Sequence, residues 1–177
     1  MDYTVFSTEF PDVKVFYNEP LKNYTFTKTG GRAAILIFPK DKKEASAVMH
    51  WLREHNIPTT ILGNASNVII KDGGISGAVI MLNDMSHLTV SGTQIVAEGG
   101  VALIDVSKEA AKNGLTGLEF ACGIPGSVGG AIFMNAGAYG GEVSEVVEYV
   151  EVITSDGEFK TYTNEDLDFS YRHSHVQ

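Results

Sequence analysis

The sequence has almost no cysteine, a single tryptophan and no long hydrophobic run. Cys122 is the sole cysteine among 177 residues, which excludes an intrachain disulfide and a cysteine-based metal cluster. The N-terminal decapeptide lacks the basic segment and apolar run of a signal peptide, and no stretch is apolar over enough residues to span a membrane. His50 and His55 lack the i, i+4 spacing of a zinc motif, so we expect no metal. A cytoplasmic protein is the simplest interpretation.

Basic residues are also scarce. The chain has 13 Lys and Arg against 22 Asp and Glu, a formal net charge of −9 and a pI of about 4.9. A nucleic-acid-binding protein needs a basic surface that displaces counterions, so this class is set aside. An acidic chain can still bind a phosphorylated cofactor through local backbone N–H groups. The hydrophobic content of 44% is that of a globular protein with one domain or two small ones.

The first half of the chain has the pattern of a parallel α/β unit. Ala34–Phe38 is a compact apolar run that predicts a buried strand. Asp41 with Glu44 three residues later resembles a capping box, and apolar residues at helical spacing continue to Asn56. Residues 1–25 read as a docking segment with a short helix. Three further strands are expected at Thr59–Leu62, Val68–Ile70 and Ala78–Leu82. The strand–helix–strand order predicts a right-handed crossover with parallel strands.

The second half has an α+β pattern with antiparallel pairing. A hairpin is expected over residues 88–98, followed by a helix that Gly114 closes. A glycine-rich segment covers residues 122–141, and a second hairpin turns at residues 155–158. We expect a domain boundary near residues 83–86.

Three motifs have the composition of a binding site. Gly63–Asn67 (GNASN) can direct successive N–H groups at one anion, although on its own a plain turn is the better interpretation. In the glycine-rich segment, small residues let the backbone lie against a flat ring or a pyrophosphate. The apolar residues within it argue against a flexible linker. Arg172, in the sequence YRHS, offers paired donors to a carboxylate or phosphate, but alone it would be an ordinary surface residue.

Taken in order, TGGRA (29–33), GNASN (63–67), GIPGSVGGAIFMNAGAYGGE (123–142) and YRHS (171–174) resemble the UDP-N-acetylenolpyruvoylglucosamine reductases. The resemblance covers nearly the whole chain and is nearer to the Gram-positive-type branch of the family. The block at 123–142 is its specific part.

The resemblance implies an α+β fold, the FAD-binding fold of the vanillyl-alcohol-oxidase or PCMH type, with two α+β subdomains. Residues 1–84 would form the N-terminal FAD-binding subdomain and residues 85–177 an incomplete second one. FAD would lie between them, and a C-terminal substrate-binding domain would be absent.

The resemblance also assigns site residues. Gly63–Asn67 would line the pyrophosphate, and the glycine-rich block would contact the flavin and its ribityl-phosphate chain. The cofactor-binding residues implied are Gly63, Asn64, Ala65, Ser66, Asn67, Gly123, Ile124, Pro125, Gly126, Ser127, Gly129, Gly130, Ala131, Asn135, Ala136, Gly137, Ala138, Tyr139 and Gly140.

The family reaction is a ping-pong reduction that uses NADPH and FAD. NADPH reduces FAD, and the reduced flavin passes hydride to UDP-N-acetylglucosamine enolpyruvate, which gives UDP-N-acetylmuramate for peptidoglycan. Arg172 would be the catalytic arginine that stabilises charge on the substrate carboxyl. The family's catalytic serine and glutamate have no counterpart here, so we expect a fragment that is inactive alone. We also expect it to be a monomer.

One further departure concerns Ala65, which occupies a position that is often glycine in the family. If its φ is positive, alanine costs on the order of 1 kcal/mol there. Two alternatives stay open: another FAD-linked oxidase of the same fold, and a non-catalytic binding module that kept the fold.

Overall fold

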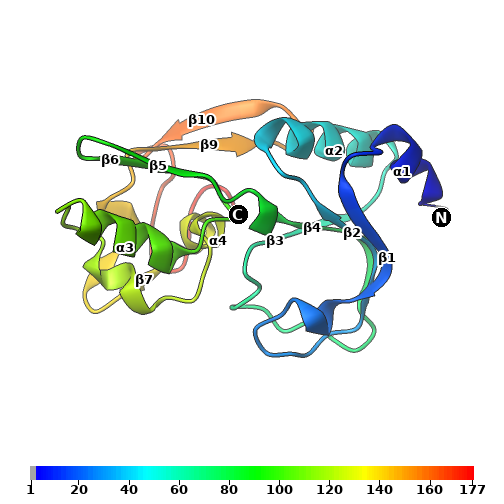
Figure 1. Ribbon diagram of the computed structural model, residues 1–177, viewed down its shortest axis with the longest axis horizontal. Helices are drawn as coiled ribbons and strands as arrows, with labels where there is room; N and C mark the ends of the chain where they lie inside the picture. Colours follow the sequence, from blue (N-terminus) through cyan, green and yellow to red (C-terminus); the bar gives the residue numbers. More distant parts are fainter. Residues whose placement is uncertain (1–2) are drawn as a thin grey trace. The chain divides into compact units, whose positions relative to one another are not determined.

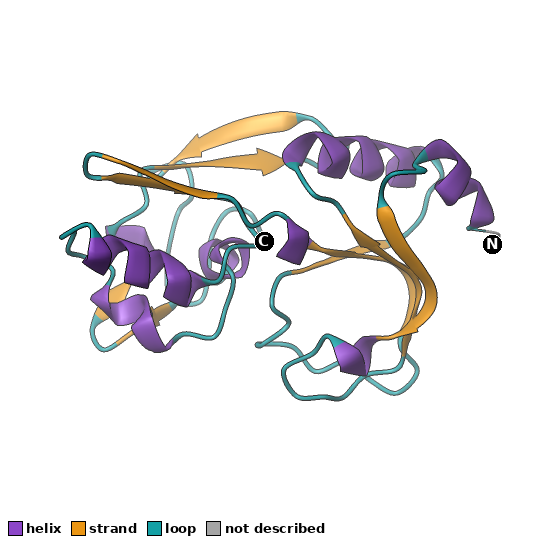
Figure 2. Cartoon of the chain, in the orientation of Figure 1, coloured by secondary structure: helices purple, strands orange, loops and turns teal. Residues whose placement is uncertain are grey.

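A computed structural model describes residues 3–177. The chain forms two compact units, shown by element in Figure 1 and by secondary structure in Figure 2. The first unit comprises the chain up to Met85 together with Ile153–Glu158, and the second comprises Ser86–Val152 and Phe159–Gln177. Residues 153–158 therefore join the first unit, although they lie within the range 85–177 that was assigned to the second subdomain.

The first unit is built on a four-stranded sheet with the order β1-β2-β4-β3. β2 and β4 pair in parallel, as do β4 and β3, whereas β1 is antiparallel to β2 at the edge. The expected parallel pairing is thus confirmed. The elements are α1 Thr4–Glu9, β1 Lys14–Pro20, η1 Leu21–Asn23, β2 Arg32–Phe38, α2 Lys42–Glu54, β3 Thr59–Leu62, β4 Ile75–Met81 and η2 Leu82–Asp84.

Helix α2 begins where the sequence predicts. The Asp41 carboxylate accepts hydrogen bonds from the N–H groups of Lys43 and Glu44, both at 2.9 Å. Glu44 in turn accepts from the N–H of Lys40 at 3.0 Å. These bonds satisfy N–H groups that a helix leaves without internal partners.

The central strands β2 and β4 are buried on both faces, which explains why they read as continuous apolar runs. Ile35, Ile37 and Ile80 point to the face that α1 and α2 cover, where Trp51 of α2 joins the same core. The opposite face is covered by loops, and its buried residues are Leu21, Ala33, Leu36, Phe38, Leu62, Ala65, Ile70, Val79 and Met81.

Two expectations for this unit need correction. Val68–Ile70 is not a strand, because the run joins no sheet and lies in the loop that follows β3. Ile70 is buried in the loop-covered core, whereas Ile69 is 84% exposed. The N-terminal segment contributes strand β1 as well as the expected short helix.

The tip of the hairpin formed by β9 (Tyr149–Ile153) and β10 (Phe159–Thr163) packs on α2. Ser46 donates a hydrogen bond to the carbonyl of Gly157 at 2.5 Å, and Arg53 pairs with Asp156 at 3.2 Å. A Cβ on Gly157 would lie 2.6 Å from the Ser46 carbonyl oxygen. Glycine is therefore required where the two backbones meet.

The second unit consists of short helices and two-stranded sheets. Both hairpins and the helix that were expected here are confirmed. The elements are β5 Leu88–Ser91, β6 Gln94–Ala97, α3 Leu103–Lys112, η3 Glu119–Gly123, α4 Val128–Phe133, β7 Gly137–Ala138, β8 Gly141–Glu142, η4 Val143–Glu145, β9 Tyr149–Ile153 and β10 Phe159–Thr163.

Gly114 closes α3 as predicted. Its φ is +70°, its N–H donates to the carbonyl of Ala111, and the N–H of Leu115 donates to the carbonyl of Ala110 at 2.9 Å. This pair of bonds is the Schellman motif. The core of the unit lies under α3, η3 and α4, with Leu103, Phe120, Ala121, Ala131, Ile132 and Val143 buried.

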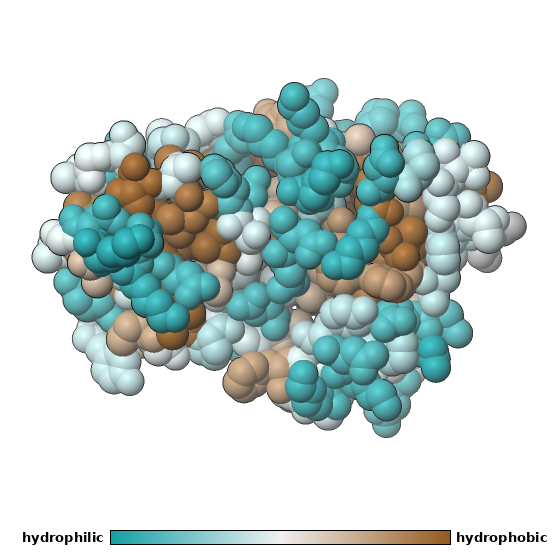
Figure 3. Space-filling model, viewed as in Figure 1, coloured by the Kyte–Doolittle hydropathy of each residue, from teal (hydrophilic) through white to brown (hydrophobic). Residues whose placement is uncertain are grey.

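The surface visible in Figure 3 is mostly hydrophilic, with hydrophobic residues gathered in separate patches. Within residues 3–177, none of the helices has the length and apolar character needed to cross a membrane.

Candidate functional site

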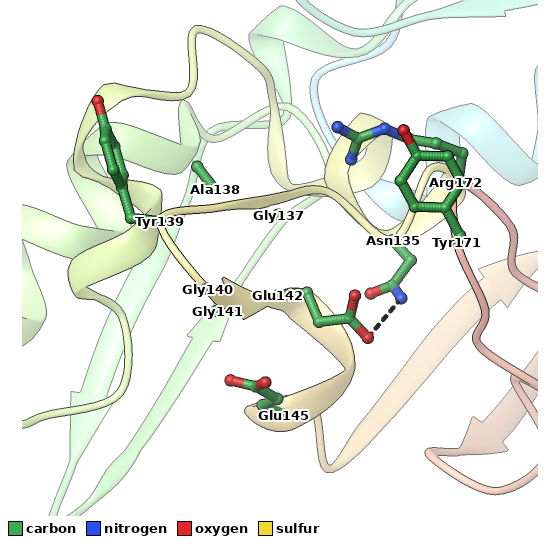
Figure 4. A pocket seen from close by; sticks show the side chains of 10 residues that line it. All are labelled: Asn135, Gly137, Ala138, Tyr139, Gly140, Gly141, Glu142, Glu145, Tyr171 and Arg172. Atoms are coloured by element: carbon green, nitrogen blue, oxygen red, sulfur yellow. Dashed lines mark hydrogen bonds between the residues drawn. The ribbon is translucent and has the colours of Figure 1, made fainter.

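A pocket of about 320 Å³ opens in the second unit, where the glycine-rich segment meets the YRHS turn (Figure 4). Its walls come from the β7–β8 hairpin, the 3-10 helix η4 that follows it, and the turn near the end of the chain. The lining residues are Asn135, Gly137, Ala138, Tyr139, Gly140, Gly141, Glu142, Glu145, Tyr171 and Arg172.

The first wall is a tight hairpin. Tyr139 (φ +55°) and Gly140 (φ +89°) are both left-handed, as the two-residue loop of a type I′ turn demands. The turn leaves the Tyr139 side chain 90% exposed at the mouth of the pocket. Position 137 requires glycine, because a Cβ there would lie 2.9 Å from the Cβ of Glu142.

Asn135 connects this wall to the opposite one. Its side chain is 1% exposed and has three protein partners. Nδ2 donates to Glu142 Oε1 at 2.9 Å and to the Ser170 carbonyl at 3.2 Å, while Oδ1 accepts from the Ser144 N–H at 3.0 Å. The dashed line in Figure 4 marks the bond to Glu142. Asn135 therefore ties the hairpin to the turn that carries Arg172.

The second wall is the turn around Arg172. Ser170 and His173 exchange backbone hydrogen bonds, both 3.1 Å long, and Arg172 has φ +57°. The guanidinium carbon lies 5.3 Å from the centre of the Tyr171 ring, a cation–π distance. Buried Ser174 anchors the turn, because its hydroxyl donates to the Phe133 carbonyl at the end of α4 at 3.0 Å.

Residues of opposite charge, Glu142 and Arg172, line the same pocket. The Ser144 hydroxyl lies 2.5 Å from Glu142 Oε1. Hydrogen bonds from Ser144 and Asn135, with the positive charge of Arg172, hold the pKa of Glu142 below its ordinary value. Glu142 is therefore a carboxylate near neutral pH, and Arg172 has an anion nearby.

The segment Gly123–Ala131 begins with open backbone and ends in a helix. A Cβ on Gly123 would meet no atom within 4 Å, and one on Gly126 only a side-chain carbon at 3.8 Å. By contrast, the N–H of Gly129 donates to the carbonyl of Gly99 at 2.8 Å, and Ala131 is buried in the core. A ligand therefore has access to the first part of the segment rather than to α4.

The loop Gly63–Asn67 lies in the first unit, directly after β3. Its central residue, Ala65, has φ +45° and is 6% exposed, so the left-handed conformation expected to be costly for alanine is present. The Ala65 carbonyl accepts from the N–H of Phe26 at 3.2 Å. Asn64 accepts from the side chain of Asn83 at 3.1 Å.

The structure brings part of the expected site together. Asn135, Gly137, Ala138, Tyr139, Gly140 and Arg172 line one pocket. Ala136 instead packs against the core of the second unit, and Gly63–Asn67 belongs to the first unit. The motifs include Gly141, Glu142 and Tyr171 but gave them no site role, and Glu145 lies outside the motifs; all four line the pocket. Glu142 ends the quoted block GIPGSVGGAIFMNAGAYGGE, so its place beside the glycines was the available signal.

Comparisons with known proteins identify the family of the chain. Residues 33–163 match the model of a family described as FAD binding domain. All 177 residues align at 52% identity with a UDP-N-acetylenolpyruvoylglucosamine reductase from Pediococcus pentosaceus, of which the chain covers 59%. The chain thus spans somewhat more than half of that relative, and the resemblance expected from the motifs is confirmed.

Solved structures confirm the expected fold. A crystal structure of the UDP-N-acetylenolpyruvylglucosamine reductase from Thermus caldophilus matches with a TM-score of 0.75 and 37% identity, covering 93% of this chain and 57% of that one. A 6-hydroxy-D-nicotine oxidase from Arthrobacter nicotinovorans matches with a TM-score of 0.65 at 17% identity, over 88% of this chain and 36% of that one. This second likeness concerns the fold alone.

Proposed function

The chain belongs to the FAD binding domain family, and we propose that it is the FAD-holding part of a UDP-N-acetylenolpyruvoylglucosamine reductase. The reaction proposed for the whole protein is the NADPH- and FAD-dependent reduction of UDP-N-acetylglucosamine enolpyruvate to UDP-N-acetylmuramate for peptidoglycan synthesis. The observation that carries the proposal is the pocket in which the glycine-rich hairpin and Arg172 meet. The single cysteine, Cys122, is a free thiol. The reducing cytoplasm keeps thiols free, so a cytoplasmic location is consistent with it.

The exposed backbone of the candidate site fits a flavin dinucleotide. Gly123 and Gly140 have no atom within 4 Å of an added Cβ, so the backbone there is open to close contact with a ring or a phosphate. Tyr139 presents an exposed aromatic side chain beside Gly140. In the first unit, the strained loop Gly63–Asn67 would hold the pyrophosphate. When bound, FAD would supply the hydride chemistry.

Arg172 would act on the substrate. Addition of hydride to the enolpyruvyl double bond places negative charge on the conjugated carboxylate. The guanidinium offers paired, permanently charged donors that match this group. Such stabilisation in the transition state is worth on the order of 3 kcal/mol. The left-handed turn and its anchor at Ser174 hold the Arg172 backbone in place beside the pocket.

Two measurements test the proposal. First, the purified chain is titrated with FAD and followed by flavin absorption and fluorescence. Saturable binding supports it, whereas no binding would leave a cofactor-free module as the better interpretation. Second, in the complete protein NADPH should bleach the flavin and the enolpyruvyl UDP-sugar should restore its colour. An oxidase of the same fold would bind FAD but would give no response to the UDP-sugar.

The role of Arg172 has its own test in the complete protein. Arg172→Ala should lower kcat about a hundredfold, from the ~3 kcal/mol above, while FAD still binds. Lys108→Ala is the matched control, because it removes an exposed cation of α3 that pairs with Asp105 on the same helix. Equal kcat values in the two variants would contradict the proposed catalytic role of Arg172.

A further inference from the structure

We propose that Asn83, a residue outside every motif of the sequence, binds the ligand by accepting a hydrogen bond from a sugar hydroxyl next to the pyrophosphate. This inference rests on the proposed function, since FAD is the ligand concerned. It concerns the first unit alone, in which both Asn83 and the loop Gly63–Asn67 lie.

The position of Asn83 follows from the sheet. β3 and β4 are parallel neighbours, and Leu62 pairs with Met81 at their last residues. The loop Gly63–Asn67 and the 3-10 helix η2, which contains Asn83, therefore leave the sheet side by side at its carboxyl edge. In open α/β sheets this edge is where ligands bind.

Of the two polar atoms in the side-chain amide of Asn83, one has a hydrogen-bond partner and the other has none. Its Nδ2 donates to Asn64 Oδ1 at 3.1 Å, which fixes the orientation of the group. Its Oδ1 is buried and is the one buried side-chain polar atom among residues 3–177 that has no hydrogen-bond partner. Proteins rarely leave such an acceptor unpaired, because the oxygen has lost water and gained nothing. A bound ligand would supply the missing donor.

The chemistry of the free atom selects the ligand group. A carbonyl oxygen needs an O–H or N–H donor, and phosphate oxygens offer none when ionised. The groups that flank the pyrophosphate of FAD are two polyols, the adenosine ribose and the ribityl chain. Backbone N–H groups of the loop suit the phosphates, so Asn83 would bind a hydroxyl of the adjoining sugar.

Strain in the same loop supports a binding role. Ala65 has φ +45° and is 6% exposed, a conformation that costs energy for a residue with a Cβ. Strained residues gather at ligand sites, where the surrounding structure holds them in place. A strained residue and an unpaired acceptor thus occur together at one sheet edge.

The test compares Asn83→Leu with Asn23→Leu. Leucine has nearly the shape of asparagine but cannot accept a hydrogen bond. Asn23 lies in the same unit, is exposed, and has only a 3.4 Å surface bond to Glu19. The affinities for FAD, ADP and FMN are measured by calorimetry, and the thermal midpoint is measured without ligand.

Asn83→Leu should weaken FAD binding about five- to tenfold, the effect of one lost hydrogen bond. The ligand-free midpoint should match that of Asn23→Leu, because each variant loses one hydrogen bond that its side chain donates within the protein. An equal loss for ADP assigns the bond to the ribose, and an equal loss for FMN assigns it to the ribityl chain. Unchanged FAD affinity, or a loss matched by a fall in the ligand-free midpoint, would overturn the inference. If the unsubstituted chain binds none of the three ligands, the proposed function fails as well.

Discussion

Replacing Asn135 with alanine should destabilise the second unit more than any exposed substitution in it. The side chain has three protein partners: Glu142, the carbonyl of Ser170 and the N–H of Ser144. Each bond contributes about 1 kcal/mol, and its loss leaves a partner unpaired. Asn135 also has φ +40°, which costs alanine about 1 kcal/mol more. We therefore expect a loss of about 4 kcal/mol in the free energy of unfolding.

Asp168→Ala is the matched control for backbone strain. Asp168 lies in the same unit, is exposed and has φ +43°, so the substitution removes a residue that tolerates the left-handed region without removing a buried network. We expect a loss of about 1 kcal/mol for it. The difference between the two variants then measures the hydrogen bonds alone.

The assay is urea unfolding of the complete chain. Trp51, the sole tryptophan, lies in the first unit, so its fluorescence follows that unit while far-UV circular dichroism follows both. Asn135→Ala should shift the circular dichroism transition and leave the tryptophan transition in place. If the two variants lose the same stability within about 1 kcal/mol, the Asn135 network does not hold the pocket walls together.

Two other predictions concern charge and backbone contact. Because the pKa of Glu142 is lowered, its carboxylate stabilises the folded unit above the ordinary carboxyl pKa, and this contribution disappears as the pH falls through the lowered value. Glu142→Gln should therefore flatten the acid side of the thermal midpoint against pH, and an unchanged profile would count against the network. Gly157→Ala should cost about 2–4 kcal/mol, since its Cβ would meet the Ser46 carbonyl at 2.6 Å. Gly92→Ala, also left-handed but with open space around it, should cost only about 1 kcal/mol in urea unfolding.

Local signals in the sequence were sufficient for elements that are fixed locally. The cap at Asp41 predicts the start of α2, and Gly114 predicts the end of α3, because each forms its hydrogen bonds within a few residues. The run Val68–Ile70 has the composition of a strand, but composition does not say whether a neighbouring strand is available. In the structure, Ile70 is buried in the core of the first unit and Ile69 is exposed to solvent.

Elements that depend on distant partners could not be predicted. Glycines oppose a helix, yet α4 forms inside the glycine-rich segment. The Ser127 hydroxyl accepts from the N–H of Gly130, and the carbonyls of Val101 and Gly99 accept from the N–H groups of the first two helical residues. These carbonyls come from a loop about thirty residues away in the chain, a separation that no local pattern reveals.

The same limit applies to the site. The NAGAYG block predicts that Asn135 contacts the cofactor, but it gives no sign of the buried protein network that links its side chain to Ser170. Asn83 gave no sequence signal, since its importance comes from the parallel pairing of β3 with β4. Motifs thus located the pocket, whereas the partners of each side chain required the structure.

The most direct test of the account is a backbone amide map of FAD binding by NMR. On addition of FAD, we expect large shifts at Gly63–Asn67 and at Gly123, Gly126 and Gly140, where the exposed backbone would meet the ligand. We expect small shifts at Gly92, an equally open glycine outside both motifs. Shifts confined to other parts of the chain, with these amides unmoved, would contradict the assignment of this backbone to a flavin dinucleotide.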